Sequence, residues 1–172
     1  RHLHRRREVV RGQLARLDEV LLRQLVLALA LQQQPQVLVR VRASGLNRAD
    51  LIMASGRAHG AHGGAGAILG LEFAGEVVET GSQVTGIKVG DRVMCSGNDG
   101  YAEYAVTDYG RVAKIPANNM TYTQAATLPI ALQTMHNALV TAGRLKKGES
   151  VLIQGASSGV GAPNPAQLER YI

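Results

Sequence analysis

The stretch "ILGLEFAGEVVETG" at residues 68–81 decides the fold, because it has the composition of a strand with glycines embedded in it. Glycines inside a strand mark tight bends or places where another backbone approaches closely. Short apolar stretches then recur at spacings of about ten residues, separated by Gly and Asp turns. They are "GDRVMCSG" (90–97), "YAEYAVTD" (101–108) and "RVAKIP" (111–116). This interval is typical of a closed or nearly closed β-barrel.

The residues before this stretch predict one more strand, a helix and a loop. "VLVRVRA" (37–43) alternates apolar and basic residues, which indicates a half-exposed strand. "LNRADLIMASG" (46–56) predicts a short helix that ends at Gly56. "RAHGAHGGAGA" (57–67) offers no side chains able to form a core, so we expect a loop there.

The pattern turns helical after Pro116. Pro129 suits a first helical turn, and Gly143 a C-terminal cap. Between them, one apolar face is predicted from the spacing of Leu132, Met135, His136, Leu139 and Val140. "ESVLIQ" (149–154) has the character of a buried strand and leads into "GASSGVG" (155–161). The order is therefore a barrel, a helix and the opening of an α/β unit.

The charge of the chain is concentrated at its beginning. Residues 1–34 carry seven Arg and three acidic residues, a charge of +4 within a total of +6. No aromatic residue lies among these arginines, so base stacking and nucleic-acid binding are not supported. Leucines at three- and four-residue steps favour an amphipathic helix. A targeting segment is the alternative, but the stretch contains no Ser.

The remaining composition limits compartment and membrane contact. No stretch reaches the roughly 18–20 consecutive apolar residues of a membrane span. The single cysteine, Cys95, excludes an internal disulfide and suits a reducing compartment. We therefore expect a cytoplasmic protein without membrane or nucleic-acid partners.

The glycine turn at residues 155–161 is open to three interpretations. Gly155, Gly159 and Gly161 suit a nucleotide turn, in which bare N–H groups at a helix start meet a pyrophosphate. "GASSG" also fits a nucleophile elbow with Ser157, but no His follows His136 to complete that chemistry within the chain. The third interpretation is a turn with a structural purpose alone.

Several motifs in order resemble the zinc-independent quinone oxidoreductase branch of the medium-chain dehydrogenase/reductase family. They are "VLVRVRASGLNRADL", "ILGLEFAGEVVETGSQVTGIKVGDRVMC", "GYAEYAV" and "AATLPIALQTMHNALVTAGRLKKGESVLIQGASSGVG". The resemblance spans residues 37–161 and implies a GroES-like β-barrel followed by a Rossmann nucleotide-binding domain. On this basis we expect an atypical, helix-favouring segment at 1–34 and a GroES-like catalytic domain at 35–120. Residues 121–172 would hold a linking helix and the first strand and glycine turn of a truncated Rossmann domain.

The metal-binding residues of zinc-dependent relatives are missing from this sequence. Those relatives place a Cys near the position of Asn47 and a His before the Glu of a Gly-His-Glu motif, where this chain has Leu71 before Glu72. His59 and His62 could pair on a metal, but no third ligand is evident, and a catalytic zinc usually takes three protein ligands. We expect no metal site.

The resemblance implies hydride transfer from NADPH to a quinone or an α,β-unsaturated carbonyl compound. Asn47 would face the nicotinamide or the substrate oxygen, and Asp50 would hold the turn around it. Capping of the following helix would explain Asn47 equally well. Thr134 matches a family position near the nicotinamide, although an ordinary helix residue would also fit. The pyrophosphate would meet Gly155, Ala156, Ser157, Ser158, Gly159, Val160 and Gly161.

The sequence also departs from the family. A Tyr often follows the glycine that corresponds to Gly56, whereas this chain has Arg57 and Ala58, which leaves proton donation unassigned. "APNPAQLERYI" (162–172) replaces the apolar helix expected after the turn, so we expect a fragment of a larger enzyme. The leading hypothesis is an NADPH-dependent reductase, active in the complete protein, and an enoyl-thioester reductase would share its fold and cofactor. The alternative is a non-enzymatic GroES-like domain or an inactive fragment acting in protein association. The oligomeric state stays open, with a homo-oligomer as one option.

Overall fold

The computed structural model describes residues 34–60, 62–64, 66–117 and 119–153. Five strands form one antiparallel sheet in the order β6–β1–β4–β5–β7. They are β1 (Gln36–Ser44), β4 (Glu72–Thr80), β5 (Arg92–Ser96), β6 (Tyr104–Asp108) and β7 (Val112–Lys114). Each of the strands predicted within the barrel is confirmed.

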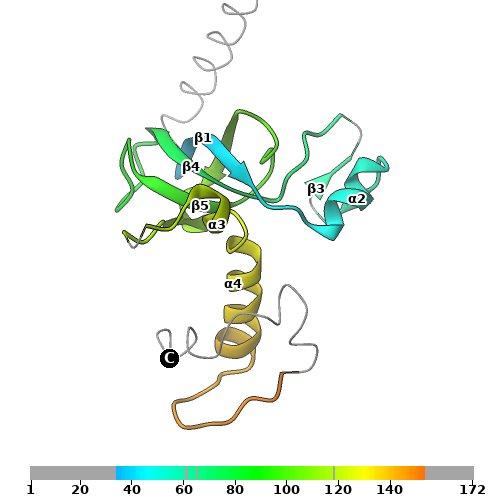
Figure 1. The fold of residues 1–172 in the computed structure, drawn as a ribbon, viewed down its shortest axis with the longest axis vertical. Helices are drawn as coiled ribbons and strands as arrows, with labels where there is room; N and C mark the ends of the chain where they lie inside the picture. Colours follow the sequence, from blue (N-terminus) through cyan, green and yellow to red (C-terminus); the bar gives the residue numbers. More distant parts are fainter. Residues whose placement is uncertain (1–33, 61, 65, 118, 154–172) are drawn as a thin grey trace, which may run out of the picture.

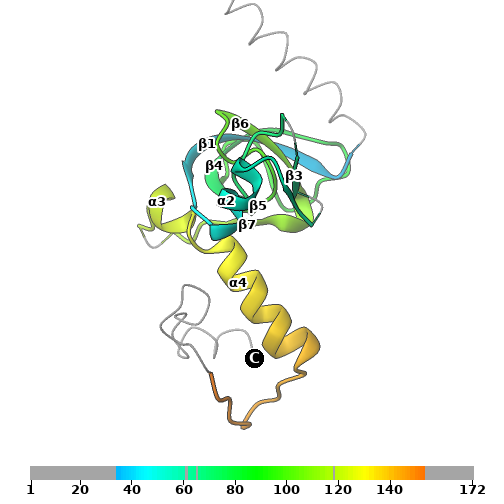
Figure 2. The ribbon, with the colours of Figure 1, turned by 90° about the vertical axis from the view of Figure 1, so that its right-hand side faces the viewer.

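The sheet curves around an interior but its hydrogen-bonded ladder does not close in the described residues. Figures 1 and 2 show the strands wrapping around a common core, with β6 and β7 as the two ends of the strand order. A 3₁₀ turn, η1 (Tyr109–Arg111), carries the chain from one end of the order to the other. Of the two forms expected from the sequence, the described residues form the nearly closed barrel and not the closed one.

Pairing between β1 and β4 produces much of this curvature. The register shifts between Leu38 and Val39 and again between Val41 and Ala43, and such bulges bend and twist a strand. Gly75 lies opposite Val41, and a Cβ atom there would overlap the carbonyl oxygen of Arg40. The embedded glycine thus permits the close approach of the backbones that its position in the sequence predicts.

Two apolar clusters lie on the two faces of the curved sheet. The larger cluster forms the interior and consists of Val37, Val39, Phe73, Val77, Val93, Cys95 and Ala105. The smaller one joins the outer face to the short helix α3 (Tyr122–Ala125), through Ala74, Ile115, Ala125 and Ala126. Phe73 and Ala74 are neighbours on β4 and belong to different clusters, as expected where side chains alternate between two buried faces.

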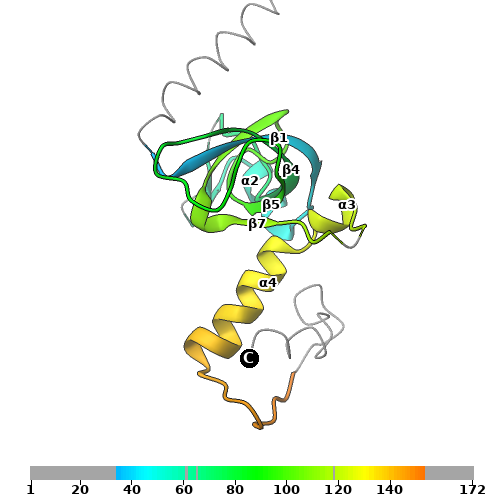
Figure 3. The same ribbon diagram turned by 90° about the vertical axis from the view of Figure 1, so that its left-hand side faces the viewer.

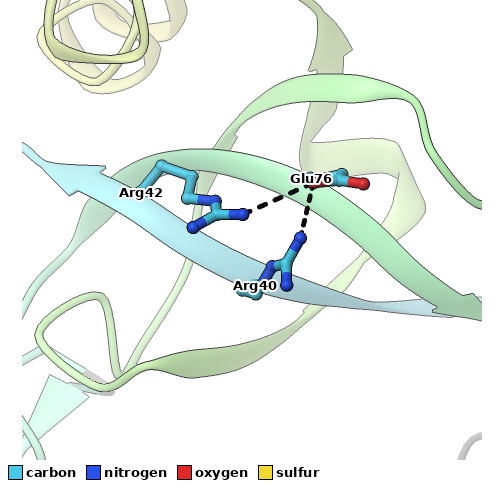
Figure 4. A network of polar contacts seen from close by, with 3 residues as sticks. All are labelled: Arg40, Arg42 and Glu76. Atoms are coloured by element: carbon cyan, nitrogen blue, oxygen red, sulfur yellow. Dashed lines mark hydrogen bonds and ion pairs between the residues drawn. The ribbon is translucent and has the colours of Figure 1, made fainter.

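A polar network lies on the exposed side of β1 and β4. Arg40 donates to Glu76 with 2.8 Å between Nη2 and Oε2, and Arg42 approaches the same oxygen to 3.7 Å (Figure 4). The pKa of Glu76 is lowered, first by the hydrogen bond from Arg40 and then by the charge of that residue. All three side chains are at least a third exposed, so this network is weakly coupled to the interior.

A helix and a small hairpin cover one end of the sheet. The helix α2 (Arg48–Ala54) confirms the prediction for residues 46–56, and Gly56 ends it with a φ of +80°. The loop expected at 57–67 contains two short paired strands, β2 (Ala58–His59) and β3 (His62–Gly63). We missed this hairpin because its residues lack the β-branched and aromatic types on which strand prediction depends.

A helix follows the sheet in the chain and extends away from it, as Figures 1 and 3 show. α4 (Pro129–His136) begins with Pro129 at its first position, which confirms that prediction, and continues as the π-helix η2 (Asn137–Ala142). On the predicted apolar face Met135 is buried, whereas His136 is exposed. Gly143 caps the C-terminal end of this helix, as predicted, but with a φ of −73°. The next residue, Arg144, has the left-handed conformation, with a φ of +51°.

The buried strand predicted at residues 149–154 is not formed in the described part, residues 149–153. Val151 and Leu152 are 42% and 87% exposed. A strand of this apolar kind needs neighbours on both sides for its backbone hydrogen bonds, and no described strand lies beside it. The Rossmann opening is therefore not observed, and residues 155–161 and 1–33 lie outside the description.

Among the described residues, the helices are too short or too polar to cross a membrane.

Candidate functional site

Asn47 and Asp50 meet at the beginning of α2. Asn47 immediately precedes the helix with an extended backbone, and its N–H donates to Oδ2 of Asp50 at 2.7 Å. Asp50 is 6% exposed, so this turn is held by a buried carboxylate. The structure thus brings together the two residues that the resemblance assigned to the turn.

Tyr101 is a third member of this group that sequence reasoning missed. Its hydroxyl donates to Oδ2 of Asp50 at 2.8 Å, from a loop 51 residues further along the chain. Burial, together with the neighbouring Asp50 carboxylate, raises the pKa of Tyr101 to about 12. The other carboxylate oxygen of Asp50, Oδ1, is buried and has no hydrogen-bond partner among the described residues.

Glu72 connects Asn47 to the helix α4. Its carboxylate accepts from Nδ2 of Asn47 at 2.9 Å and from the backbone N–H of Ile130 at 3.0 Å. Glu72 is 5% exposed, and Ile130 is the second residue of α4. The residue before α4 is Leu128, whose side chain cannot cap a helix, so Glu72 supplies the acceptor for a free N–H there. In the sequence, Glu72 stands out only through Leu71, the residue before it.

A cavity of about 380 Å³ lies beside this network. Its wall is formed by His59, His62, Leu71, Ser96, Gly97, Arg111, Ile130, Gln133 and Thr134. Thr134, which the resemblance places near the nicotinamide, is one of the residues in this wall. Asn47 and Asp50 are not part of the cavity wall. Glu72 connects Asn47 to Ile130, which is part of it.

The polar groups of the wall differ in how firmly they are held. Nδ1 of His62 is hydrogen-bonded to the side-chain amide of Asn98, which holds the imidazole ring in place. By contrast, neither Gln133 nor Thr134 has a side-chain partner within the described ranges, so both are free to bond a ligand. Arg111 and Gln133 also line a second, mostly apolar cavity of about 130 Å³.

The two histidines considered as a metal pair lie directly opposite each other in the β2–β3 hairpin. In the part of the chain that the structure describes, no three His, Cys, Asp or Glu side chains are grouped so that they could hold a metal ion. Cys95 is buried in the interior of the sheet, where burial raises its pKa to about 12.

The fold and the sequence of this region match a known family. Residues 33–117 match the model of the alcohol dehydrogenase GroES-like domain. This part of the chain is a GroES-like domain that carries a C-terminal helix. An enoyl reductase and a quinone oxidoreductase are among its structural neighbours.

Individual relatives are much longer than this chain. The highly reducing polyketide synthase gloL of Glarea lozoyensis is 38% identical over 126 residues, which are 73% of this chain and 5% of that protein. The CurK enoyl reductase is 31% identical with a TM-score of 0.66, and the match covers 81% of this chain and 44% of that one. The quinone oxidoreductase of Pseudomonas syringae pv. Tomato is 32% identical with a TM-score of 0.59, and the match covers 76% of this chain and 40% of that one. The chain thus spans less than half the length of each of these proteins.

Proposed function

We propose that the chain supplies the substrate side of an NADPH-dependent reductase that transfers a hydride to an α,β-unsaturated carbonyl compound, with an enoyl thioester as the acceptor. The observation that carries this proposal is the cavity, whose wall combines apolar Leu71 and Ile130 with Gln133 and Thr134, two polar side chains without a partner among the described residues. The similarity to polyketide synthases and to the CurK enoyl reductase supports the thioester.

The described residues fit a nicotinamide. Its carboxamide has both a donor and an acceptor, and Gln133 and Thr134 offer both kinds of group from one turn of α4. When bound, NADPH supplies the hydride, and the protein supplies orientation and exclusion of water. The glycine turn proposed for the pyrophosphate, residues 155–161, lies outside the described residues.

The chain's own residues have separable tasks in this proposal. Thr134 and Gln133 orient the nicotinamide, and Leu71 and Ile130 keep water from the reacting carbon. Asn47 donates to the acceptor's oxygen, on which negative charge develops as the β-carbon is reduced, and such donors stabilise the transition state. Asp50 holds the turn that carries Asn47.

A quinone is the second candidate acceptor, because the solved relatives include quinone oxidoreductases. Its reduction also places negative charge on an oxygen, so Asn47 would serve it in the same way. The two acceptors differ in shape, and competition between them is the direct comparison.

The test uses the native protein that contains residues 1–172, with NADPH and either a 2-enoyl thioester or a quinone. We expect NADPH consumption with a higher kcat/KM for the thioester. Thr134→Val should lower kcat/KM by about 3- to 10-fold, the worth of one hydrogen bond. Thr123→Val, an exposed threonine on α3, is the matched control and should change nothing. Absence of NADPH consumption with both acceptors would contradict the proposal.

A further inference from the structure

We propose that Glu72 is a positioning residue that sets the orientation of the Asn47 amide and ties it to the first turn of α4. The proposal rests on the proposed function, because it concerns how Asn47 meets the acceptor. The resemblance assigns no role to Glu72, and the structure shows it buried between the two elements.

First, the contact with Glu72 fixes which end of the Asn47 amide faces this carboxylate. An ionised carboxylate accepts hydrogen bonds and has no proton to give. The Asn47 atom that lies 2.9 Å from Oε1 of Glu72 must therefore be the donor Nδ2. Since Glu72 occupies one N–H of Asn47, the second N–H remains for another partner. If the side chain at position 72 could also donate, the Asn47 amide could turn over. Its Oδ1 would then face the oxygen of the acceptor, and no hydrogen bond would form between them.

The second step concerns the helix. The other carboxylate oxygen of Glu72 accepts from the N–H of Ile130, whose side chain is in the cavity wall. Gln133 and Thr134 follow on the same helix, which extends away from the sheet (Figure 3). A negative charge beside the first turn of a helix also interacts favourably with its dipole. One carboxylate thus holds both the Asn47 amide and the helix that carries the nicotinamide-binding side chains.

The third step is steric. Gly45 precedes Asn47 by two residues and donates from its N–H to the carbonyl oxygen of Glu72 at 3.0 Å. A Cβ at Gly45 would lie 2.5 Å from Oε1 of Glu72 and 2.6 Å from the carbonyl oxygen of Ala126. Because Gly45 has no side chain, the Glu72 carboxylate can occupy the position in which it makes its two hydrogen bonds.

The main test is Glu72→Gln in the native protein. Gln has nearly the same shape, but its single oxygen can accept from only one of the two donors. If that oxygen accepts from the N–H of Ile130, the NH₂ group faces Asn47, whose amide must turn over to accept through Oδ1. If it accepts from Asn47, the NH₂ group meets the N–H of Ile130. We expect kcat for the enoyl thioester to fall by about 10- to 100-fold, as misplacement of a reacting group does. The KM for the thioester should change little, because the lost contact acts in the transition state.

Glu76→Gln is the matched control, since it makes the same change on the same strand at the exposed network of Figure 4. It should leave kcat and KM unchanged. A purely structural role for Glu72 would lower the amount of active enzyme but leave the kcat of the folded fraction, measured by active-site titration, unaltered. An unaltered kcat in folded Glu72→Gln would overturn the proposal.

A second measurement needs neither a variant nor activity. In the unsubstituted chain the two side-chain N–H protons of Asn47 should have widely separated resonances, one of them shifted by the carboxylate, and the amide of Ile130 should be protected from exchange. Ordinary Asn resonances and a fast-exchanging Ile130 amide would overturn the proposal even if the variant fails to fold. If these signatures are present while no acceptor consumes NADPH, the proposed function fails and the linkage stands.

Discussion

Gly45→Ala is the substitution whose effect the structure defines most closely. The added Cβ would lie 2.5 Å from Oε1 of Glu72 and 2.6 Å from the backbone oxygen of Ala126, whereas real contacts of this kind are not below 3.0 Å. Both contacts are too short, so the Glu72 carboxylate and the backbone at Ala126 must each move relative to residue 45 by about 0.5 Å, and overpacking of this kind costs about 1–3 kcal/mol. Displacement of Glu72 adds about 1.5–3 kcal/mol, the worth of a hydrogen bond to a charged group.

The expected loss of unfolding free energy is therefore about 2.5–6 kcal/mol, or roughly 5–25 °C in melting temperature at about 2–4 °C per kcal/mol for a chain of 172 residues. Circular dichroism melts of the purified chain measure the melting temperature. Hydrogen exchange at the Ile130 amide shows whether its hydrogen bond to Glu72 is lost. We expect faster exchange at Ile130 in Gly45→Ala.

Gly86→Ala provides the control for this prediction. Gly86 has a φ of +77°, and no atom lies within 4 Å of the position that a Cβ would take, so alanine there costs only backbone strain, about 1–2 kcal/mol. Equal melting temperatures for the two variants, with unchanged protection at Ile130 in both, would refute the steric reasoning at Gly45.

Three further predictions concern titratable groups. Cys95, which is fully buried with a pKa raised to about 12, should resist alkylation at pH 9.0 in the folded chain and react fully in denaturant; labelling of the folded chain would contradict its burial. The pKa of Tyr101 is raised from 10.0 to about 12, so its contribution to stability is complete below pH 10.0 and is lost as the pH rises towards 12. Tyr101→Phe should remove that part of the pH dependence in denaturant melts, and an identical profile would show that Tyr101 is not the group responsible. The pKa of Glu76 is lowered, so its ion pair with Arg40 stabilises above pH 4.5 and is lost below it. The difference in melting temperature between Glu76→Gln and the unsubstituted chain should be small at neutral pH and vanish in acid or high salt, and a salt-independent difference would argue against an ionic origin.

Local patterns in the sequence were sufficient for most of the sheet. The alternation at 37–43 and the Gly and Asp turns between short apolar stretches predict β1, β4, β5, β6 and β7, because each depends on residues next to one another. The end of α2 at Gly56 and the start of α4 at Pro129 were predicted for the same reason. The β2–β3 hairpin was missed because glycine, alanine and histidine carry no strand signal.

The network behind the cavity could not be predicted, because it depends on contacts between distant residues. Glu72 is 25 residues from Asn47 and 58 from Ile130, and Tyr101 is 51 from Asp50. Such pairs meet only once the strand order and register are known, and neither follows from the pattern of one strand. The strand expected at 149–154 failed for a related reason: an apolar stretch becomes a strand only beside a partner.

The central claim, that this domain serves hydride transfer to an enoyl thioester, is tested most directly by an isotope experiment. The native protein containing residues 1–172 is incubated with a 2-enoyl thioester and NADPH that carries deuterium at the transferable position, and the product is analysed by mass spectrometry. The account predicts a saturated thioester with one deuterium on its β-carbon. An unchanged enoyl thioester, in a sample where the protein is folded and NADPH is bound, would contradict it.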